Sequence, residues 1–156
     1  MTHPDLSLSQ QAIDRRRAVV YRHAVLSGLK EIYAQVARHR DVPTTLSEVM
    51  GVTTLLRWDE LTIVPRFGFA SAEQYYREMS LGLLLDALRV PALLIQNVSD
   101  PMVPPWTYDR FMESPIDRLR VEHMAGGGHV AFSNPLNLGQ GPMPVEHAVL
   151  RWLTTV

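Results

Sequence analysis

Apolar positions in the first quarter of the chain recur with helical spacing. After Ser7 they follow a spacing close to the helical repeat of 3.6 residues as far as Val36, and Pro43 ends the pattern, so one long helix is predicted there. Ser7 and Gln10 have the spacing of a capping box at its start. The basic run 15–17 lies off the apolar stripe. We expect it to be a solvated helix face rather than a site for an anionic partner. The stripe consists of Ile13, Val20, Val25, Leu29, Ile32 and Val36.

Shorter helices follow. Thr45 and Glu48 form a second capping box, which predicts a helix over residues 46–58. Residues 58–69 are aromatic and punctuated by proline and glycine, so they are predicted to form an irregular, packed connection. A further helix is predicted to begin at Ser71, and a short one to run over 81–88.

The second half of the chain alternates between strand and helix patterns. Residues 92–98 are almost continuously apolar, as expected for a parallel strand that is buried on both faces. A crossover helix over 106–112, a turn at Ser114–Pro115 and a second strand over 118–124 complete a predicted βαβ unit. Residues 133–144 suit a surface loop, and residues 145–153 suit a closing helix.

An acid and a histidine follow the two predicted strands. Asp100 comes just after the first strand, and His129 follows the glycines at 126–128 after the second. The carboxyl ends of parallel strands meet at one edge of a sheet, where open α/β folds place their ligands. Asp100 could instead cap a turn before Pro101, and His129 could be a core histidine. A metal site that adds His123 is a minor alternative, because the segments lack a metal-ligand spacing motif.

Composition narrows the class of protein. The net charge of −1 over 156 residues argues against a nucleic-acid-binding surface. The chain has no cysteine, no signal-peptide pattern at its start and no apolar run long enough to cross a membrane. We therefore expect a soluble, cytoplasmic protein with no transmembrane segment, no nucleic-acid partner, no cofactor and no metal.

Two readable strands are too few for a parallel sheet to stand alone, and an apolar edge strand invites association. The chain is therefore expected to be the carboxyl-terminal half of a larger α/β domain. An alternative is that it forms an oligomer, or pairs with a partner chain, through an exposed sheet edge.

Several motifs occur together in a specific order. This combination resembles the YheT/embryogenesis-associated-protein group of α/β hydrolases over roughly residues 15–153. The motifs are Trp58-Asp-Glu, Pro65-x-x-Gly-Phe69, Tyr75-Tyr76-Arg77, Leu88-Arg-Val-Pro91, Asp100-Pro101 and Gly127-Gly128-His129-Val130-x-Phe132.

The resemblance implies a domain organisation and a chemistry. Residues 1–8 would be a tail, 9–88 a helical cap-like insertion, and 89–156 the carboxyl-terminal part of the hydrolase core. Asp100 and His129 would be the acid and the base of a Ser-His-acid triad in a carboxylesterase or lipid-ester hydrolase, whose substrate is a small-molecule ester or a lipid. The cap would use aromatic residues in lid packing or in lining an acyl pocket; these are Trp58, Phe67, Phe69, Tyr75 and Tyr76.

The nucleophile that this chemistry needs is not in the sequence. No Gly-x-Ser-x-Gly occurs in the chain, and Ser27 lies within a predicted helix rather than at a strand–helix turn. The chain is thus expected to be a truncated hydrolase that is inactive by itself. A non-catalytic binding module derived from the fold is an alternative. A haloperoxidase-like or acyltransferase activity would use the same acid and histidine.

Overall fold

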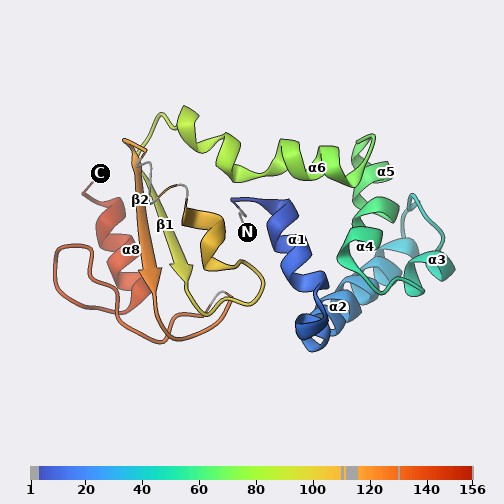
Figure 1. Cartoon of the computed structure of the whole chain (residues 1–156), viewed down its shortest axis with the longest axis horizontal. Helices are drawn as coiled ribbons and strands as arrows, with labels where there is room; N and C mark the ends of the chain where they lie inside the picture. Colours follow the sequence, from blue (N-terminus) through green and yellow to red (C-terminus); the bar gives the residue numbers. More distant parts are fainter. Residues whose placement is uncertain (1–3, 110, 112–115, 130, 156) are drawn as a thin grey trace. The chain divides into compact units, whose positions relative to one another are not determined.

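The computed structural model describes residues 4–109, 111, 116–129 and 131–155. The chain divides into two compact units, Met1–Leu81 and Gly82–Val156, which we call the helical unit and the sheet unit. Both are drawn in Figure 1, and each is described by itself. No helix in the described part of the chain combines the length and the apolar character needed to span a membrane.

The helical unit contains six α-helices and a short 3₁₀ helix within its described residues. They are α1 (Leu6–Asp14), η1 (Arg16–Ala18), α2 (Val19–Ala37), α3 (Leu46–Met50), α4 (Leu55–Leu61), α5 (Ile63–Phe67) and α6 (Ala72–Met79).

The single long helix predicted from Ser7 to Pro43 is wrong. The chain leaves α1 at Arg15, whose backbone is extended (φ −64°, ψ 151°), and it becomes helical again in η1 and α2. The break is stabilised by Arg22, whose guanidinium donates to the carbonyl of Asp14 at 2.8 Å. Carbonyls at a helix end have no partner within the helix, and this side chain supplies one. Arg22 is therefore a capping residue, whereas the side chains of the basic run 15–17 are exposed, as predicted.

The predicted apolar stripe does not match the buried face of α2. Leu26 and Tyr33 are buried, whereas Val20 is 78% exposed and Ile32 is 61% exposed. The spacing was right for a helix, but several large apolar side chains of α2 lie outside the buried face. Which side chains are buried depends on where the neighbouring helices pack, and the residue spacing within α2 does not specify this.

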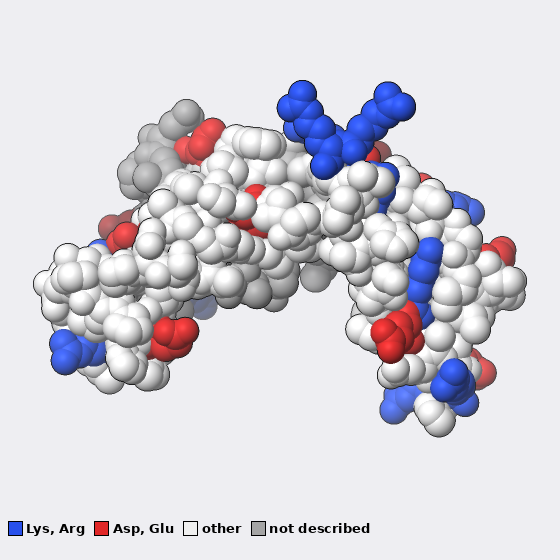
Figure 2. Space-filling model, turned by 90° about the horizontal axis from the view of Figure 1, so that it is seen from below, with Lys and Arg blue, Asp and Glu red and all other residues white. Residues whose placement is uncertain are grey.

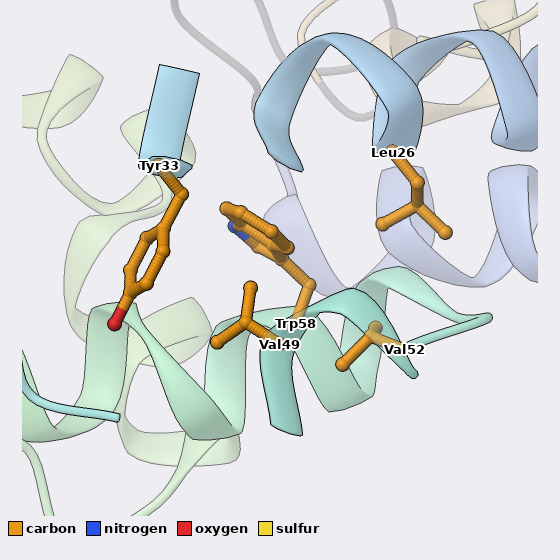
Figure 3. Packing of buried hydrophobic residues seen from close by; sticks show 5 residues of the cluster. All are labelled: Leu26, Tyr33, Val49, Val52 and Trp58. Carbon is orange, nitrogen blue, oxygen red and sulfur yellow. The ribbon is translucent and has the colours of Figure 1, made fainter. Parts of the chain in front are cut away.

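The core of the helical unit forms where α2, α3 and α4 meet. Figure 3 shows the Trp58 indole between Tyr33 on one side and Leu26 and Val52 on the other. The Tyr33 and Trp58 rings pack edge to face, with centroids 5.8 Å apart and planes at 80°, a favoured aromatic geometry. The Tyr33 hydroxyl donates to the Thr44 carbonyl at 2.8 Å, so this buried polar group is satisfied.

The predicted helix over 46–58 is two helices, α3 and α4, separated at residues 51–54. The start of α4 is capped from a distant part of the chain. The Asp14 carboxylate accepts hydrogen bonds from the backbone amides of Leu55 and Leu56 at 2.9 and 3.1 Å. A carboxylate at a helix amino terminus satisfies unpaired amides and opposes the positive end of the helix dipole. The segment 58–69, predicted to be irregular, is mostly helical in α4 and α5.

Helix starts were predicted better than helix lengths. Thr45 caps α3 as predicted, because its hydroxyl accepts from the Glu48 amide. The Glu48 carboxylate accepts from that hydroxyl, whereas a capping box bonds it to the backbone amide of the cap residue, so only the first half of the predicted box is confirmed. Ser71 caps α6 as predicted. The cap of α1 is Asp5, which accepts from Leu8 at 2.9 Å, and not the predicted Ser7.

A buried carboxyl joins α4 to α6. The Tyr76 hydroxyl donates to Asp59 at 2.6 Å. Burial raises the pKa of Asp59 to about 6; the Tyr76 hydrogen bond lowers it, and the nearby charge of Asp14 raises it. Burial also raises the pKa of Tyr76, and its hydrogen bond to Asp59 adds to the effect. Asp59 therefore changes its protonation state in mildly acidic solution.

The sheet unit contains two parallel strands, as predicted. β1 (Ala92–Asn97) pairs with β2 (Leu119–Met124), with Ala92 opposite Leu119 and Asn97 opposite Met124. The closing helix is confirmed as α8 (Val145–Leu153). The short helix predicted over 81–88 is two 3₁₀ turns, η2 (Leu81–Leu83) and η3 (Leu85–Ala87). Figure 1 shows both strands running in the same direction, with α8 beside them.

The two faces of the sheet have different covers. α8 packs on the face that carries Ile95 and Met124. The connection after β1, which includes η4 (Pro105–Tyr108), contacts the other face, where Gln96 donates to the Val103 carbonyl at 3.1 Å. The crossover helix predicted over 106–112 begins as this 3₁₀ turn, while residue 112 and the turn at Ser114–Pro115 lie outside the described residues.

The strands are less buried than their apolar sequence predicts. Leu93, Leu94 and Ile95 are all partly exposed in this two-stranded sheet. Among the described residues, the side-chain oxygen of Gln96 is buried without a hydrogen-bond partner, which is costly in a protein interior. The described residues therefore do not fully cover this sheet. After β2, the predicted surface loop closes as a hairpin through an antiparallel bridge between Leu136 and Met143.

Candidate active site

The structure brings Asp100 and His129 together at the carboxyl ends of β1 and β2. His129 Nδ1 lies 2.8 Å from Asp100 Oδ2, and both side chains are largely buried. The two residues are separated by 29 positions in the sequence. The parallel pairing of β1 with β2 places the two loops that carry them at one edge of the sheet.

The second oxygen of Asp100 is held by its own loop. Oδ1 accepts from the backbone amides of Met102 and Val103 at 2.8 and 3.1 Å, and Asp100 is only 7% exposed. This is the turn-capping geometry that an Asp before proline predicts. It does not exclude contact with the histidine, because each oxygen has its own partners. The carboxylate is therefore fixed in orientation, with Oδ2 directed at the imidazole.

The glycines before His129 allow a turn that other residues could not make. Gly126 and Gly127 have φ of 79° and 115°. A Cβ at position 127 would lie 2.0 Å from the Ala131 carbonyl oxygen. Gly128 donates to that same carbonyl at 3.0 Å, which closes the turn. Glycine is needed at 126 and 127 because side chains rarely adopt these conformations and because the backbone approaches so closely.

Asn97, a residue that the sequence analysis did not select, ties this turn to β1. Its side-chain amide donates to the carbonyls of Gly126 and Ala131 at 2.6 and 3.2 Å. Its oxygen accepts from the Ser99 amide at 2.9 Å, and the residue is 1% exposed. One side chain thus joins the loop that leads to Asp100 with the loop that carries His129. The signal in the sequence was a pair of polar residues, at 96 and 97, that ends an otherwise apolar strand.

The surroundings of the pair are partly apolar. Burial raises the pKa of Tyr108 to about 12, and the charge of Asp100 contributes to the same shift. Tyr108 therefore remains a neutral phenol at physiological pH. Its ring meets the exposed His123 ring edge to face, with centroids 6.3 Å apart.

The metal alternative has no support in the described part of the chain. Within the described residues, no group of three or more His, Asp or Glu side chains is arranged to hold a metal ion.

Figure 2 shows basic and acidic side chains interspersed over one face of the molecule.

The aromatic residues predicted to form a lid have different roles in the helical unit. Trp58 is in the core and also lines a cavity. Tyr76 is buried against Asp59, and the rings of Phe69, Tyr75 and Tyr76 are in sequential contact. Phe67 is 67% exposed.

A mixed arrangement of helices with a parallel sheet, bearing a hydrogen-bonded carboxylate and imidazole at the strand ends, is typical of α/β enzymes that use an acid–histidine pair. Comparison with known proteins identifies relatives of this chain. The chain is 28% identical over 118 residues to an abhydrolase domain-containing protein of Dictyostelium discoideum, an alignment that covers 73% of this chain and 29% of that protein.

Two further relatives carry names that refer to esters. The YheT protein of Escherichia coli, whose name marks it as an esterase candidate, is 29% identical over 140 residues, 87% of this chain and 40% of that protein. The medium-chain fatty acid ethyl ester synthase/esterase 2 of Saccharomyces cerevisiae is 31% identical over 91 residues, 58% of this chain and 20% of that protein. No protein-family model and no solved structure matches the chain significantly.

These similarities confirm the predicted relationship: the chain is related to the α/β hydrolases, and its relatives include YheT. The chain spans between a fifth and two fifths of the length of the curated relatives described above.

Proposed function

We propose that this chain is the carboxyl-terminal part of a serine-type α/β hydrolase that cleaves carboxylic esters, with a small-molecule or lipid ester as its substrate. Asp100 is the orienting acid and His129 is the general base. The observation that carries the proposal is the 2.8 Å contact between His129 Nδ1 and Asp100 Oδ2. The ester-related names of the relatives support the substrate class.

In the proposed reaction, the Asp100 carboxylate accepts the Nδ1 proton of His129. This fixes the tautomer in which Nε2 can take a proton from a serine hydroxyl. As the serine oxygen attacks the ester carbonyl, the imidazole becomes charged and the nearby carboxylate stabilises that charge. The imidazole then returns the proton to the leaving alcohol, and the same pair activates water to release the acid.

The serine and the oxyanion donors come from residues outside this sequence, in the proposed scheme. The sequence contains no Gly-x-Ser-x-Gly elbow, and a base with its acid cannot form an acyl-enzyme alone. The partly exposed strands and the unpaired Gln96 oxygen are consistent with a sheet that continues into further strands. In this scheme residues 9–88 are the cap-like insertion and residues 89–156 belong to the core.

The first test reads the DNA upstream of the Met1 codon over about 150–200 codons, since single α/β domains routinely run to 200–250 residues or more. The proposal expects a Gly-x-Ser-x-Gly segment between a strand pattern and a helix pattern. Absence of any such segment, in frame or adjacent, would count against a split or truncated hydrolase.

The second test measures activity. The purified chain is expected not to hydrolyse a p-nitrophenyl ester faster than buffer does, and not to be labelled by a serine-directed fluorophosphonate. Co-expression with the upstream segment is expected to restore both, and the double variant Asp100→Asn, His129→Gln is expected to abolish the hydrolysis. Protein-dependent hydrolysis by the chain alone would refute the claim that the nucleophile lies elsewhere.

A non-catalytic interaction module is the second candidate, and the partial exposure of Leu93, Leu94 and Ile95 favours it. In that case the sheet would associate with a second chain rather than with its own missing strands. Size-exclusion chromatography together with thermal unfolding distinguishes the hydrolase candidate from the interaction module. A clean monomer with one cooperative melting transition would count against the module.

A further inference from the structure

The helical unit contains an apolar cavity. A cavity of about 240 Å³ is formed by the second half of α2, the turn at 40–43 and helices α4 and α5. Two of its apolar side chains, Ile32 and Val36, are 61% and 42% exposed, so the cavity is open to solvent on the α2 side. Its apolar lining includes Leu29, Ile32, Tyr33, Val36, Val42 and Trp58.

The two hydroxyl groups of the wall already donate to backbone carbonyls. The Tyr33 hydroxyl donates to the Thr44 carbonyl at 2.8 Å, and the Thr62 hydroxyl donates to the Trp58 carbonyl at 2.8 Å. A polar ligand group inside the cavity would lose its bonds to water and find few partners to replace them. The interior therefore suits a hydrocarbon. The volume is just below the range of about 300–1,000 Å³ typical of small-molecule sites, so one alkyl chain fits better than a two-chain lipid.

The charge at the mouth is mainly positive. Arg40 and Arg66 line the same cavity and are exposed. Among the described residues neither forms an ion pair. Asp41 also lines the cavity, which leaves one net positive charge from these three side chains. A guanidinium offers two parallel N–H donors that match the two oxygens of a carboxylate.

We propose that this cavity binds a single-chain alkyl carboxylate, with the hydrocarbon among the apolar residues of α2 and α4 and the carboxylate at Arg40 and Arg66. The two features point to the same ligand class: a mainly apolar interior whose two hydroxyls already donate to backbone carbonyls, and a mouth with two arginines. The site belongs to the helical unit alone, so the proposal does not depend on the proposed hydrolase activity of the sheet unit.

Isothermal titration of the whole chain with three ten-carbon probes tests the ligand class. Decanoate is expected to bind saturably, and about tenfold more tightly than decanol, because a hydrogen bond to a charged group adds that much affinity. Decyltrimethylammonium, which carries the opposite charge on the same chain, is expected to bind more weakly than decanol.

Variants test the two halves of the site separately. The double change Arg40→Ala, Arg66→Ala is expected to weaken decanoate binding about tenfold and to leave decanol unchanged. Arg38→Ala is the matched control, because Arg38 is exposed on the same turn but does not line the cavity. Ile32→Glu is expected to abolish binding of both probes. Val20→Glu makes the same change at an exposed position of α2 away from the cavity and is expected to have no effect.

Two ligand results would overturn the proposal: no saturable decanoate binding below the concentration at which decanoate self-associates, or equal affinity for decanoate and decanol. Two variant results would do the same. In one, Arg38→Ala weakens decanoate binding as much as the double arginine change; in the other, Val20→Glu weakens it as much as Ile32→Glu. His129→Gln is expected to leave decanoate binding intact. Loss of esterase activity in a completed enzyme and loss of ligand binding are therefore separate outcomes.

Discussion

The side-chain nitrogen of Asn97 lies 2.6 Å from the position that a Cβ on Gly127 would occupy. β1 therefore ends on a side chain that touches the backbone of the loop leading to His129. This close approach explains why the turn needs a glycine, and it makes the loop that carries His129 sensitive to single changes.

Gly127→Ala should disrupt the loop that carries His129. The new Cβ would overlap the Ala131 carbonyl oxygen and the Asn97 amide, at a backbone φ of 115° that alanine rarely adopts. We expect the free energy of unfolding of the sheet unit to fall by about 3 kcal/mol or more. The downfield NMR signal of the proton between His129 and Asp100 should also be lost.

Gly128→Ala is the control for that change. A Cβ at position 128 meets nothing within 4 Å, and the residue has no positive φ. It should leave the melting temperature and the downfield signal nearly unchanged. If both alanine variants behave alike, the argument from close approach is wrong.

Asn97→Ala should weaken the link between the two strand-end loops. It leaves the Gly126 carbonyl and the Ser99 amide without their Asn97 partner, at a cost of about 2–4 kcal/mol for groups that are partly buried, whereas the Ala131 carbonyl keeps its bond to the Gly128 amide. Asn97→Asp should be no better, because a carboxylate cannot donate to the carbonyls of Gly126 and Ala131. Chemical denaturation and the downfield His129 signal report the two effects separately.

Asn137→Ala tests whether any loop asparagine would behave this way. Asn137 also bonds to two backbone groups, the amides of Gly139 and Gly141, but it lies exposed on the surface hairpin. A small loss of stability with an intact His129 signal is expected. An Asn97 variant that keeps its downfield signal would argue against a positioning role.

Asp100→Asn should lower the kcat of a hydrolase completed by a nucleophile-bearing segment by about 10⁴-fold, with little change in KM. The amide would present a donor to His129 Nδ1 and favour the wrong tautomer. Asp109→Asn, an exposed change just after η4 in the same connection, should leave kcat unchanged. Steady-state kinetics on a p-nitrophenyl ester checks both. Equal kcat values for the two variants would remove Asp100 from the proposed chemistry.

The helical unit should lose stability as the pH rises from about 4 to about 6. The pKa of Asp59 is raised from 3.8 to about 6, so the folded state binds this proton more tightly than the unfolded state does. Its contribution is fully present below pH 3.8 and is lost as the pH rises through about 6. The shift corresponds to about 3 kcal/mol. Urea denaturation at several pH values, followed by the circular dichroism of the helices, measures it.

Asp59→Asn should remove that pH dependence and make the helical unit more stable near pH 7, because the amide can still accept from Tyr76 without a buried charge. Glu60→Gln, at the exposed neighbouring position, should leave the dependence in place. A slope between pH 4 and 6 that persists in Asp59→Asn would assign it to another group.

Local sequence patterns were enough to predict the two strands and the closing helix of the sheet unit. An apolar run predicted β1, and helical spacing predicted α8 with its observed limits. The meeting of Asp100 with His129 followed from a general rule, that the carboxyl ends of paired parallel strands share one edge. Their roles in catalysis stay predictions.

Contacts between distant side chains and backbone groups were not predictable in the same way. Arg22 binds the carbonyl of Asp14 where α1 ends, and the Asp14 carboxylate accepts from the first amides of α4, which also has a local cap at Thr54. Each bond joins a side chain to a backbone position that the local pattern does not specify. Asn97 belongs to the same class of contact.

The bonds of Asp100 also imply an order of assembly. Its two amide partners are two and three residues away, whereas its histidine partner is 29 residues away. Closing a longer loop costs more chain entropy, and non-local contacts form more slowly than local ones. The acid is thus oriented by its own turn early in folding. The imidazole arrives only when β2 has aligned beside β1, so a chain that mispairs its strands would keep a formed acid turn and lose only the histidine.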